Sequence, residues 1–273
     1  MKNEFSIGVI GGGSWATALV KILCNNVAQV NWWLRSADDI AHIKKFKHNP
    51  KYLSTVEFDS EKISLYENVE EILLKSDVII LAVPSAFCNS VLKNIPKEKF
   101  KDKLIFSAIK GIIPEYNLIV GEYLNKIFEV PLANIGVITG PCHAEEVAME
   151  KLSYLTLACS EIANAEKLAA KMRCRYIKIT ASNDIFGTEY SAVLKNVIAV
   201  AGGICHGLGY GDNFLSVLVS NAIQEIERFV TAVHPNQRDI KASAYLGDLL
   251  VTAYSKFSRN RMFGTMIGKG YSV

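Results

Sequence analysis

The chain has 273 residues, of which 50% are hydrophobic and 21% are charged. This composition can form a sizeable core, and it excludes a disordered chain, a collagen-like fibre and a small disulfide-rich scaffold. The formal net charge of +3 is too small to indicate a nucleic-acid partner or a membrane surface. The length allows one large domain or two domains of ordinary size.

The six cysteines have no motif spacing, because the closest pair, Cys159 and Cys174, lies fifteen residues apart. We therefore expect no metal site and no disulfide framework. The amino-terminal residues lead directly into a strand-like run instead of a signal peptide, and the apolar runs are far shorter than the roughly 18 residues of a membrane helix. These features predict a cytoplasmic protein with reduced thiols and no insertion into a membrane.

Short apolar runs alternate with amphipathic segments through the first two thirds of the chain. Near-continuous Val, Ile and Leu runs are typical of a parallel sheet that is covered on both faces. The predicted strands are residues 5–10, 27–34, 78–83, 104–109, 135–139, 155–158 and 175–180. The predicted helices are residues 14–23, 38–47, about 113–128 and 161–172.

From Asp184 onward the pattern becomes helical, with long segments that are apolar nearly all round or at spacings of three and four. The sequence thus predicts an α/β fold, with a Rossmann-like doubly wound parallel sheet followed by an all-helical second domain. We place the dinucleotide-binding domain at residues 1–183 and a helical substrate-binding domain at residues 184–273. The glycine-rich residues 207–213 are interpreted mainly as the end of one helix and the start of the next.

The first predicted strand is followed by a glycine-rich turn that fits G-x-G-x-x-A. Gly11 allows the tight turn, Gly13 lets the backbone approach a pyrophosphate, and Ala16 permits close packing of the following helix. That helix would offer free N–H groups and a partial positive charge to the anion. The position of the motif between a strand and a helix predicts dinucleotide binding.

The second predicted strand ends at Arg35, where many dinucleotide-binding chains have an acidic residue for the adenosine ribose. A guanidinium at this point can pair with a 2′-phosphate, which favours NADP. Arg35 can also stack on adenine, so NAD stays open as the cofactor. The plainer interpretation is a solvated arginine at the end of a strand.

Other candidate residues follow later strands or interrupt apolar helices. Lys110 follows the strand at residues 104–109, where it is either an ordinary surface lysine or a cation that could reach both a cofactor and an anionic substrate. Lys195 and Asn196 stand in an otherwise apolar helix, so they either line a site or extend to solvent. Residues 258–261 read Ser-Arg-Asn-Arg, which could form a phosphate clamp or a solvated loop.

Taken in chain order, these segments resemble the bacterial NAD(P)-dependent glycerol-3-phosphate dehydrogenases. The matching segments are GGGSWATAL (11–19), AVPS (82–85), KGI (110–112), GP–A–EVA (140–148), LKNVIAVAGGI (194–204), GLGYGDN (207–213), LGDL (246–249) and SRNR (258–261). They extend over almost the whole chain, and the last four together are much more specific than the glycine turn.

The resemblance implies that the protein interconverts sn-glycerol 3-phosphate and dihydroxyacetone phosphate by hydride transfer at C2, supplying glycerol 3-phosphate for phospholipid synthesis. It implies that Lys195 is the catalytic proton acceptor. Burial and Lys110 would lower the pKa of Lys195, whereas Asp248 would oppose that shift. The implied cofactor contacts are Ser14, Trp15, Arg35, Lys110, Ala144 and Arg259. They add to Gly11 and Gly13, which the motif of the turn already indicates as cofactor contacts. The implied substrate contacts are Lys110, Gly140, Lys195, Asp248, Ser258, Arg259 and Asn260.

The chain departs from this family at Cys142 and His143, where members usually have Ser-Phe. A hydroxyl contact to substrate is therefore not carried over at that position. The family also continues beyond the SRNR segment with further helices, so we expect a second domain that is truncated. We further expect a homodimer, because apolar helices of the second domain could form an interface.

Three other interpretations stay open at this point. One is a different two-domain dehydrogenase, of the 6-phosphogluconate or ketopantoate type, and the later segments argue against it. Another is a dinucleotide-sensing regulator, although the sequence has no helix-turn-helix with a basic recognition face. The third is a fragment that binds substrate without turning it over.

Overall fold

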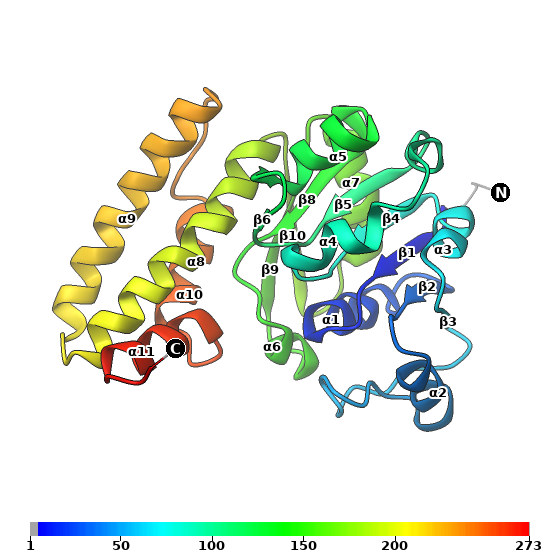
Figure 1. Ribbon diagram of the computed structural model, residues 1–273, viewed down its shortest axis with the longest axis horizontal. Helices are drawn as coiled ribbons and strands as arrows, with labels where there is room; N and C mark the ends of the chain where they lie inside the picture. The colour runs from blue at the N-terminus through cyan, green and yellow to red at the C-terminus, as the bar shows by residue number, and fades with distance from the viewer. Residues whose placement is uncertain (1–4, 273) are drawn as a thin grey trace.

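The structure, a computed structural model, describes residues 5–272. A sheet with helices on both faces forms the larger part of the molecule, and a group of helices from α8 onward stands beside it (Figure 1). The strands are β1 (Ile7–Ile10), β2 (Val30–Trp33), β3 (Ile63–Tyr66), β4 (Val78–Leu81), β5 (Leu104–Ser107), β6 (Ile112–Ile113), β7 (Leu118–Ile119), β8 (Ile135–Thr139), β9 (Ser153–Cys159) and β10 (Ile177–Ser182). The helices of the sheet part are α1 (Ser14–Leu23), α2 (Ala37–Phe46), α3 (Val69–Lys75), α4 (Ser85–Leu92), α5 (Val120–Phe128), α6 (Ala144–Ala148) and α7 (Ile162–Met172). The remaining helices are α8 (Ile185–Gly207), α9 (Asp212–Val233), α10 (Asp248–Tyr254) and α11 (Arg259–Gly268), and a π-helical turn at Ser243–Gly247 precedes α10.

The eight-stranded sheet has the order β10-β9-β8-β5-β4-β1-β2-β3. All its neighbouring pairs are parallel except β8 and β9, which pair antiparallel. The carboxyl ends of β1, β4, β5 and β8 therefore lie at one edge of the sheet. Ligands of open α/β sheets bind at this edge, so the fold brings the loops after these four strands to one place.

The sheet separates two hydrophobic clusters. Along β1, Val9 packs into the cluster that includes α1, α6 and α7, whereas the next residue, Ile10, packs into the cluster that includes α3, α4 and α5. Successive side chains of a strand point to opposite faces, and both faces are covered by helices here. This explains why the predicted strands are continuous apolar runs rather than alternating ones.

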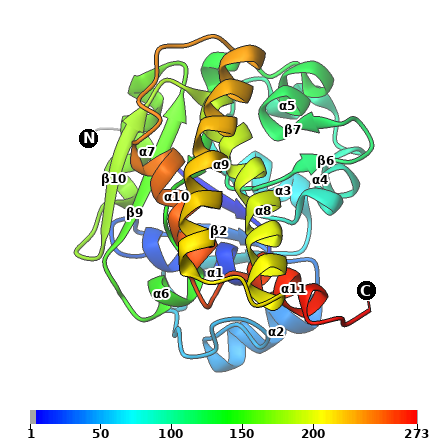
Figure 2. The same cartoon turned by 90° about the vertical axis from the view of Figure 1, so that its left-hand side faces the viewer.

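The helical part is built around two long antiparallel helices, α8 and α9, seen face-on in Figure 2. Their contact is filled by residues of α9 at spacings of three and four, with Leu249 and Ala253 of α10. The chain leaves α8 at Gly207 and enters α9 at Asp212, so the predicted helix end and helix start within residues 207–213 are confirmed.

Several predicted elements differ from the structure. The helix predicted at about 113–128 is wrong over its first part, where β6 and β7 form a small antiparallel hairpin and only Val120–Phe128 is helical. Asn117 adopts a left-handed conformation (φ 53°), which ends any helix at that point and turns the chain back. The sheet is also not wholly parallel, because β9 reverses direction after α6. β3, α3 and α4 were not predicted, since they are short and lack a long apolar run.

Candidate active site

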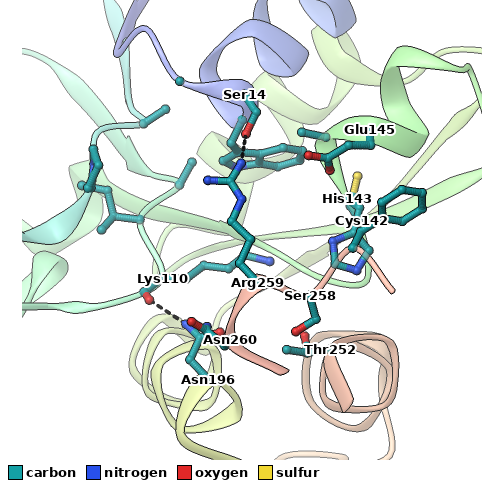
Figure 3. Close-up of a pocket in the computed structure, with 18 of the residues that line it drawn as sticks. Ser14, Lys110, Cys142, His143, Glu145, Asn196, Thr252, Ser258, Arg259 and Asn260 are labelled. Atoms are coloured by element: carbon teal, nitrogen blue, oxygen red, sulfur yellow. Dashed lines mark hydrogen bonds between the residues drawn. The ribbon is translucent and has the colours of Figure 1, made fainter. Parts of the chain in front are cut away.

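A cavity of about 530 Å³ lies between the carboxyl ends of the central strands and helices α8, α10 and α11 (Figure 3). Its volume is within the usual range of small-molecule sites. Most of the predicted site residues line it, namely Gly13, Ser14, Trp15, Lys110, Ala144, Lys195, Asp248, Ser258, Arg259 and Asn260.

The turn after β1 has the features that a bound pyrophosphate requires. Gly11 has a φ of +145°, and a Cβ at this residue would overlap the carbonyl of Ala82, so only glycine fits there. Gly13 is the N-cap of α1 and supplies no side-chain cap, and no atom lies within 4 Å of the place where its Cβ would be. The first N–H groups of α1 are thus free to bind an anion, and this turn fits a dinucleotide.

The ammonium of Lys195 is the buried polar group at the far wall of the cavity. Its Nζ donates to Asp248 Oδ1 at 2.6 Å and to Thr252 Oγ1 at 2.8 Å. Asp248 and Thr252 are one helical turn apart on α10, and the Thr252 hydroxyl also donates to the Asp248 carbonyl at 2.7 Å. Both side chains of the ion pair are nearly inaccessible to solvent, with exposed fractions of 6% and 1%.

Lys110 approaches the same carboxylate from the sheet. Its Nζ lies 3.4 Å from Asp248 Oδ2 and 3.4 Å from the carbonyl oxygen of Gly140. Thr139 Oγ1 donates to the same Asp248 oxygen at 3.3 Å. Asn196 donates from Nδ2 to the carbonyl oxygen of Lys110 at 2.9 Å, which ties α8 to the loop after β5. The two lysines and the carboxylate therefore form one connected cluster.

Burial and the neighbouring charges set the protonation of this cluster. Burial lowers the pKa of Lys195 to about 7, Lys110 reinforces the effect, and the carboxylate of Asp248 opposes it. Burial alone would raise the pKa of Asp248, but the ammonium groups of Lys110 and Lys195 hold it below its ordinary value. Near neutral pH the site thus combines an ionised carboxylate with a lysine that can gain or lose a proton.

The Ser-Arg-Asn segment is at the start of α11. Ser258 is its N-cap, and the Oγ accepts a hydrogen bond from the N–H of Arg261 at 3.3 Å. Arg259 extends across the cavity to the glycine turn, where Nη2 donates to Ser14 Oγ at 3.2 Å (Figure 3). The guanidinium is therefore at the side of the cavity that the glycine turn forms.

Three predicted site residues are not part of the cavity lining. Gly11 lies beneath the turn, and its carbonyl accepts a hydrogen bond from the Trp32 indole at 2.7 Å. Gly140 contributes the carbonyl oxygen near Lys110. Arg35 lies outside the cavity, with its guanidinium 5.9 Å from the ring centre of Phe87. The structure therefore brings Gly140 to the lysine cluster and leaves Arg35 at a more distant position.

Two family descriptions match the chain. The N-terminal part of the NAD-dependent glycerol-3-phosphate dehydrogenases matches residues 6–165, and their C-terminal part matches residues 184–273. The chain belongs to this family. The resemblance seen in the sequence is thereby confirmed, as is the predicted fold class.

Proteins that resemble this chain come from bacteria and from a eukaryote. The glycerol-3-phosphate dehydrogenases [NAD(P)+] of an Exiguobacterium species and of Bacillus velezensis are each 34% identical to it, over 97% and 98% of this chain and 78% and 77% of their own length. The crystal structure of the glycerol-3-phosphate dehydrogenase of Coxiella burnetii superposes with a TM-score of 0.89 at 27% identity, covering 98% of this chain and 82% of that one. The Saccharomyces cerevisiae structure, at 21% identity and a TM-score of 0.85, shows the same fold over 98% of this chain and 82% of its own.

The resemblance to this family assigns no role to some residues of the cavity. Thr252 could have been found from the sequence, because it stands four residues after Asp248 on one helix face. His143 also lines the cavity, and its Nε2 is buried without a hydrogen-bond partner. Burial, Lys110 and Lys195 lower the pKa of His143, so its ring is neutral near neutral pH.

Within residues 5–272, no group of three or more His, Cys, Asp and Glu side chains could hold a metal ion. The same residues include no helix that is long and apolar enough to cross a membrane.

Proposed function

We propose that this protein is an oxidoreductase that interconverts sn-glycerol 3-phosphate and dihydroxyacetone phosphate, with NADP or NAD as the cofactor. The observation that supports this most strongly is the buried Lys195–Asp248 pair, which faces the glycine turn across one cavity. Relatives 34% identical to the chain carry that activity in their names. No metal takes part in the proposed reaction.

The dinucleotide would lie along the edge formed by β1, β4 and β5. The N–H groups at the start of α1 would hold its pyrophosphate, with Ser14, Trp15 and Ala144 along the cavity wall. Arg35 would contact the adenosine end, where a guanidinium favours the 2′-phosphate of NADP. When bound, the nicotinamide accepts the hydride from C2 of the alcohol or returns it to the ketone.

Lys195 would accept the proton of the C2 hydroxyl during oxidation and return it during reduction. Its lowered pKa, about 7, leaves a neutral amine in a substantial fraction of molecules at neutral pH. Asp248 and Thr252 would fix the direction of its Nζ, since both accept from it. The side chain of Lys110 can stabilise negative charge developing on the C2 oxygen.

The substrate phosphate would bind at the start of α11. Ser258, Arg259 and Asn260 line the cavity there, and the first turn of the helix offers N–H groups and a positive dipole end. Binding energy from the phosphate, which is remote from the reacting carbon, would then orient C2 toward Lys195.

Replacing the proposed base tests this function directly. Lys195→Met should lower the rate of glycerol 3-phosphate oxidation by about 100-fold or more, because general-base catalysis contributes about 10²–10⁴. The Kd for NADPH, measured by calorimetry without substrate, should stay within about twofold of the unmodified protein, because Lys195 is on the substrate side of the cavity. Lys256→Met, at an exposed lysine outside the cavity, is the matched control. A turnover within about tenfold of the unmodified protein would exclude Lys195 as the base.

We also propose the wider setting of the enzyme. Residues 1–183 would form the dinucleotide-binding domain and residues 184–273 the helical substrate-binding domain. The enzyme would act in the cytoplasm as a homodimer and supply glycerol 3-phosphate for phospholipid synthesis. Exposed apolar side chains on the helical part, such as Val217 and Met262, support an interface there. Sedimentation at micromolar concentration tests the dimer, and a purely monomeric protein would contradict it.

A further inference from the structure

The connection between α2 and β3 passes beside the glycine turn and contributes a wall of the cavity. Tyr52 is in this connection, lines the cavity and is 38% exposed. The proposed reaction assigns no role to it or to its neighbours. Hydrogen bonds from Asn49 hold this connection against the glycine turn.

Asn49 joins the connection to the glycine turn through its side-chain amide, which is almost completely buried at 1% exposed. Its Nδ2 donates to the carbonyl oxygen of Gly12 at 3.1 Å and to Thr17 Oγ1 at 2.9 Å. Its Oδ1 accepts from the backbone N–H groups of Lys51 at 3.0 Å and Tyr52 at 3.2 Å. The Nδ2 group and the Oδ1 atom of Asn49 are thus both used. If the side-chain amide were flipped, Oδ1 would face the carbonyl oxygen of Gly12.

These bonds fix the direction of the peptide units that would bind phosphate. In a trans peptide the C=O and the following N–H point in opposite directions. Asn49 holds the Gly12 carbonyl on its own side, so the N–H of Gly13 points away from Asn49. The Gly13 carbonyl is likewise held by the Thr17 hydroxyl, at 2.9 Å, and by the Thr17 N–H, at 3.0 Å. The N–H of Ser14 is therefore directed to the opposite side, where Gly13 and Ser14 line the cavity.

We propose that Asn49 is a positioning residue for the phosphate-binding turn, and that Tyr52 is a further side chain that binds the dinucleotide. The Asn49 amide fixes the Gly12 peptide of the turn and also accepts from the backbone N–H of Tyr52. One buried amide thus connects the two segments that line this part of the site. This inference rests on the proposed function, and its ligand is the same dinucleotide. The anion-binding turn would bind the pyrophosphate, and the phenol ring of Tyr52 would contact the adjoining ribose.

The first test separates positioning of the turn from ordinary stabilisation. Asn49→Ala should weaken NADPH binding about tenfold or more, because the turn loses its fixed N–H directions. Asn49→Asp should weaken it further, since a carboxylate oxygen would face the Gly12 carbonyl. Asn25→Ala is the matched control, because Asn25 also donates to two backbone carbonyls and to the Tyr176 hydroxyl, far from the cavity. The control should lower the melting temperature and leave the NADPH Kd within about twofold.

Calorimetric titration of the full chain with NADPH alone, below the melting temperature of each variant, provides the readout. An Asn49→Ala or Asn49→Asp protein that is folded and binds NADPH with the Kd of the unmodified protein would overturn the role of Asn49. An equal loss of affinity in Asn25→Ala would overturn it as well, because the effect would then be general destabilisation.

Tyr52 provides a second variant that is not expected to affect folding, because its side chain is partly exposed. Tyr52→Ala should weaken NADPH binding about fivefold to tenfold, whereas Tyr271→Ala, at a tyrosine that is 61% exposed and outside the cavity, should not change it. An unchanged Kd for Tyr52→Ala overturns its role. These titrations contain NADPH without substrate, so they test cofactor binding separately from the reaction. A protein that binds NADPH but does not oxidise glycerol 3-phosphate would contradict the proposed reaction and leave this inference standing.

Discussion

The Lys195 ammonium shows how opposing effects at a single residue determine the chemistry. Burial lowers its pKa more than Asp248 raises it, although the two groups are in direct contact at 2.6 Å. A second cation, Lys110, shares the same carboxylate at 3.4 Å and weakens its hold on Lys195. The result is a lysine that is held in place by a carboxylate without being locked in its protonated form.

The pH dependence of the two directions of the reaction follows from this balance. Oxidation needs neutral Lys195, so its kcat/KM should rise about tenfold per pH unit below pH 7 and level off above it. Reduction needs the protonated form and should fall above pH 7. Asp248→Asn removes a group that raises the pKa of Lys195, so the midpoint for oxidation should move to lower pH. Initial rates from pH 5.5 to 9.5 check this, and an unmoved or higher midpoint in Asp248→Asn would contradict the assigned balance.

Cofactor choice should depend on Arg35, a predicted site residue outside the cavity lining. Arg35→Asp places a negative charge where the guanidinium would pair with a 2′-phosphate, so NADPH should bind about tenfold or more weaker. NADH, which lacks that phosphate, should lose much less affinity. Fluorescence titrations with both dinucleotides make the comparison, and equal weakening would mean that Arg35 stacks on adenine in either case.

At this scale the sequence carries a usable signal where a polar residue interrupts a strongly apolar pattern. Lys195 and Asn196 were singled out because polar side chains in an apolar helix need partners. The local pattern did not predict their partners, since Asp248 lies 53 residues from Lys195 in the sequence. Only the resemblance to the family placed Lys110 and Asp248 near Lys195. Asn49 and Tyr52 gave no signal at all, because in sequence they belong to an ordinary polar connection.

At the scale of elements, the position of α11 depends on close contact with α8. Four glycines make this contact, and a Cβ on any of them would overlap backbone atoms of the opposite helix. Gly203 and Gly207 belong to α8, and Gly264 and Gly268 belong to α11. This approach holds the start of α11, with Arg259 and Asn260, against the wall of the cavity that Lys195 occupies.

Filling this contact should disturb the site as well as the fold. Gly264→Ala adds a Cβ that overlaps the carbonyl of Val200, and overpacking of this kind costs about 1–3 kcal/mol, more than the roughly 1 kcal/mol gained in helix propensity. We expect a melting temperature several degrees lower and a raised KM for glycerol 3-phosphate, because α11 must move away. Gly211→Ala, with no atom near its Cβ, is the matched control and should leave KM unchanged. An unchanged KM in Gly264→Ala would mean that α11 does not position the phosphate site.

The elements that sequence reasoning missed share a physical reason. Long apolar runs and sustained helical periodicity identified the central strands and α8 and α9, because burial on both faces or along one stripe leaves a clear pattern. The β6–β7 hairpin depends on the left-handed conformation of Asn117. Asparagine tolerates that conformation but does not require it, so the residue type alone does not predict the turn. The reversal of β9 relative to β8 depends on tertiary packing, which a local pattern does not record.

At the scale of the whole molecule, the cavity has walls from both parts of the chain. The glycine turn and the strand ends provide one side, and α8, α10 and α11 provide the other (Figure 3). A direct link between the sides is the hydrogen bond from Arg259 to Ser14, which joins residues 245 positions apart. A dinucleotide on one wall therefore changes the surroundings of a guanidinium that belongs to the other wall.

Binding of dinucleotide and of glycerol 3-phosphate should consequently be coupled. NADPH and glycerol 3-phosphate do not react together, so calorimetry can measure the Kd of the substrate with and without saturating NADPH. We expect the two values to differ about fivefold or more, a coupling free energy of about 1 kcal/mol, because NADPH would reposition Arg259 at the turn. Arg259→Ala should reduce the ratio to within about twofold, whereas Lys256→Ala, which removes an exposed cation outside the cavity, should preserve it. A ratio near one in the unmodified protein would show that the two walls bind their ligands independently despite the bond between Arg259 and Ser14.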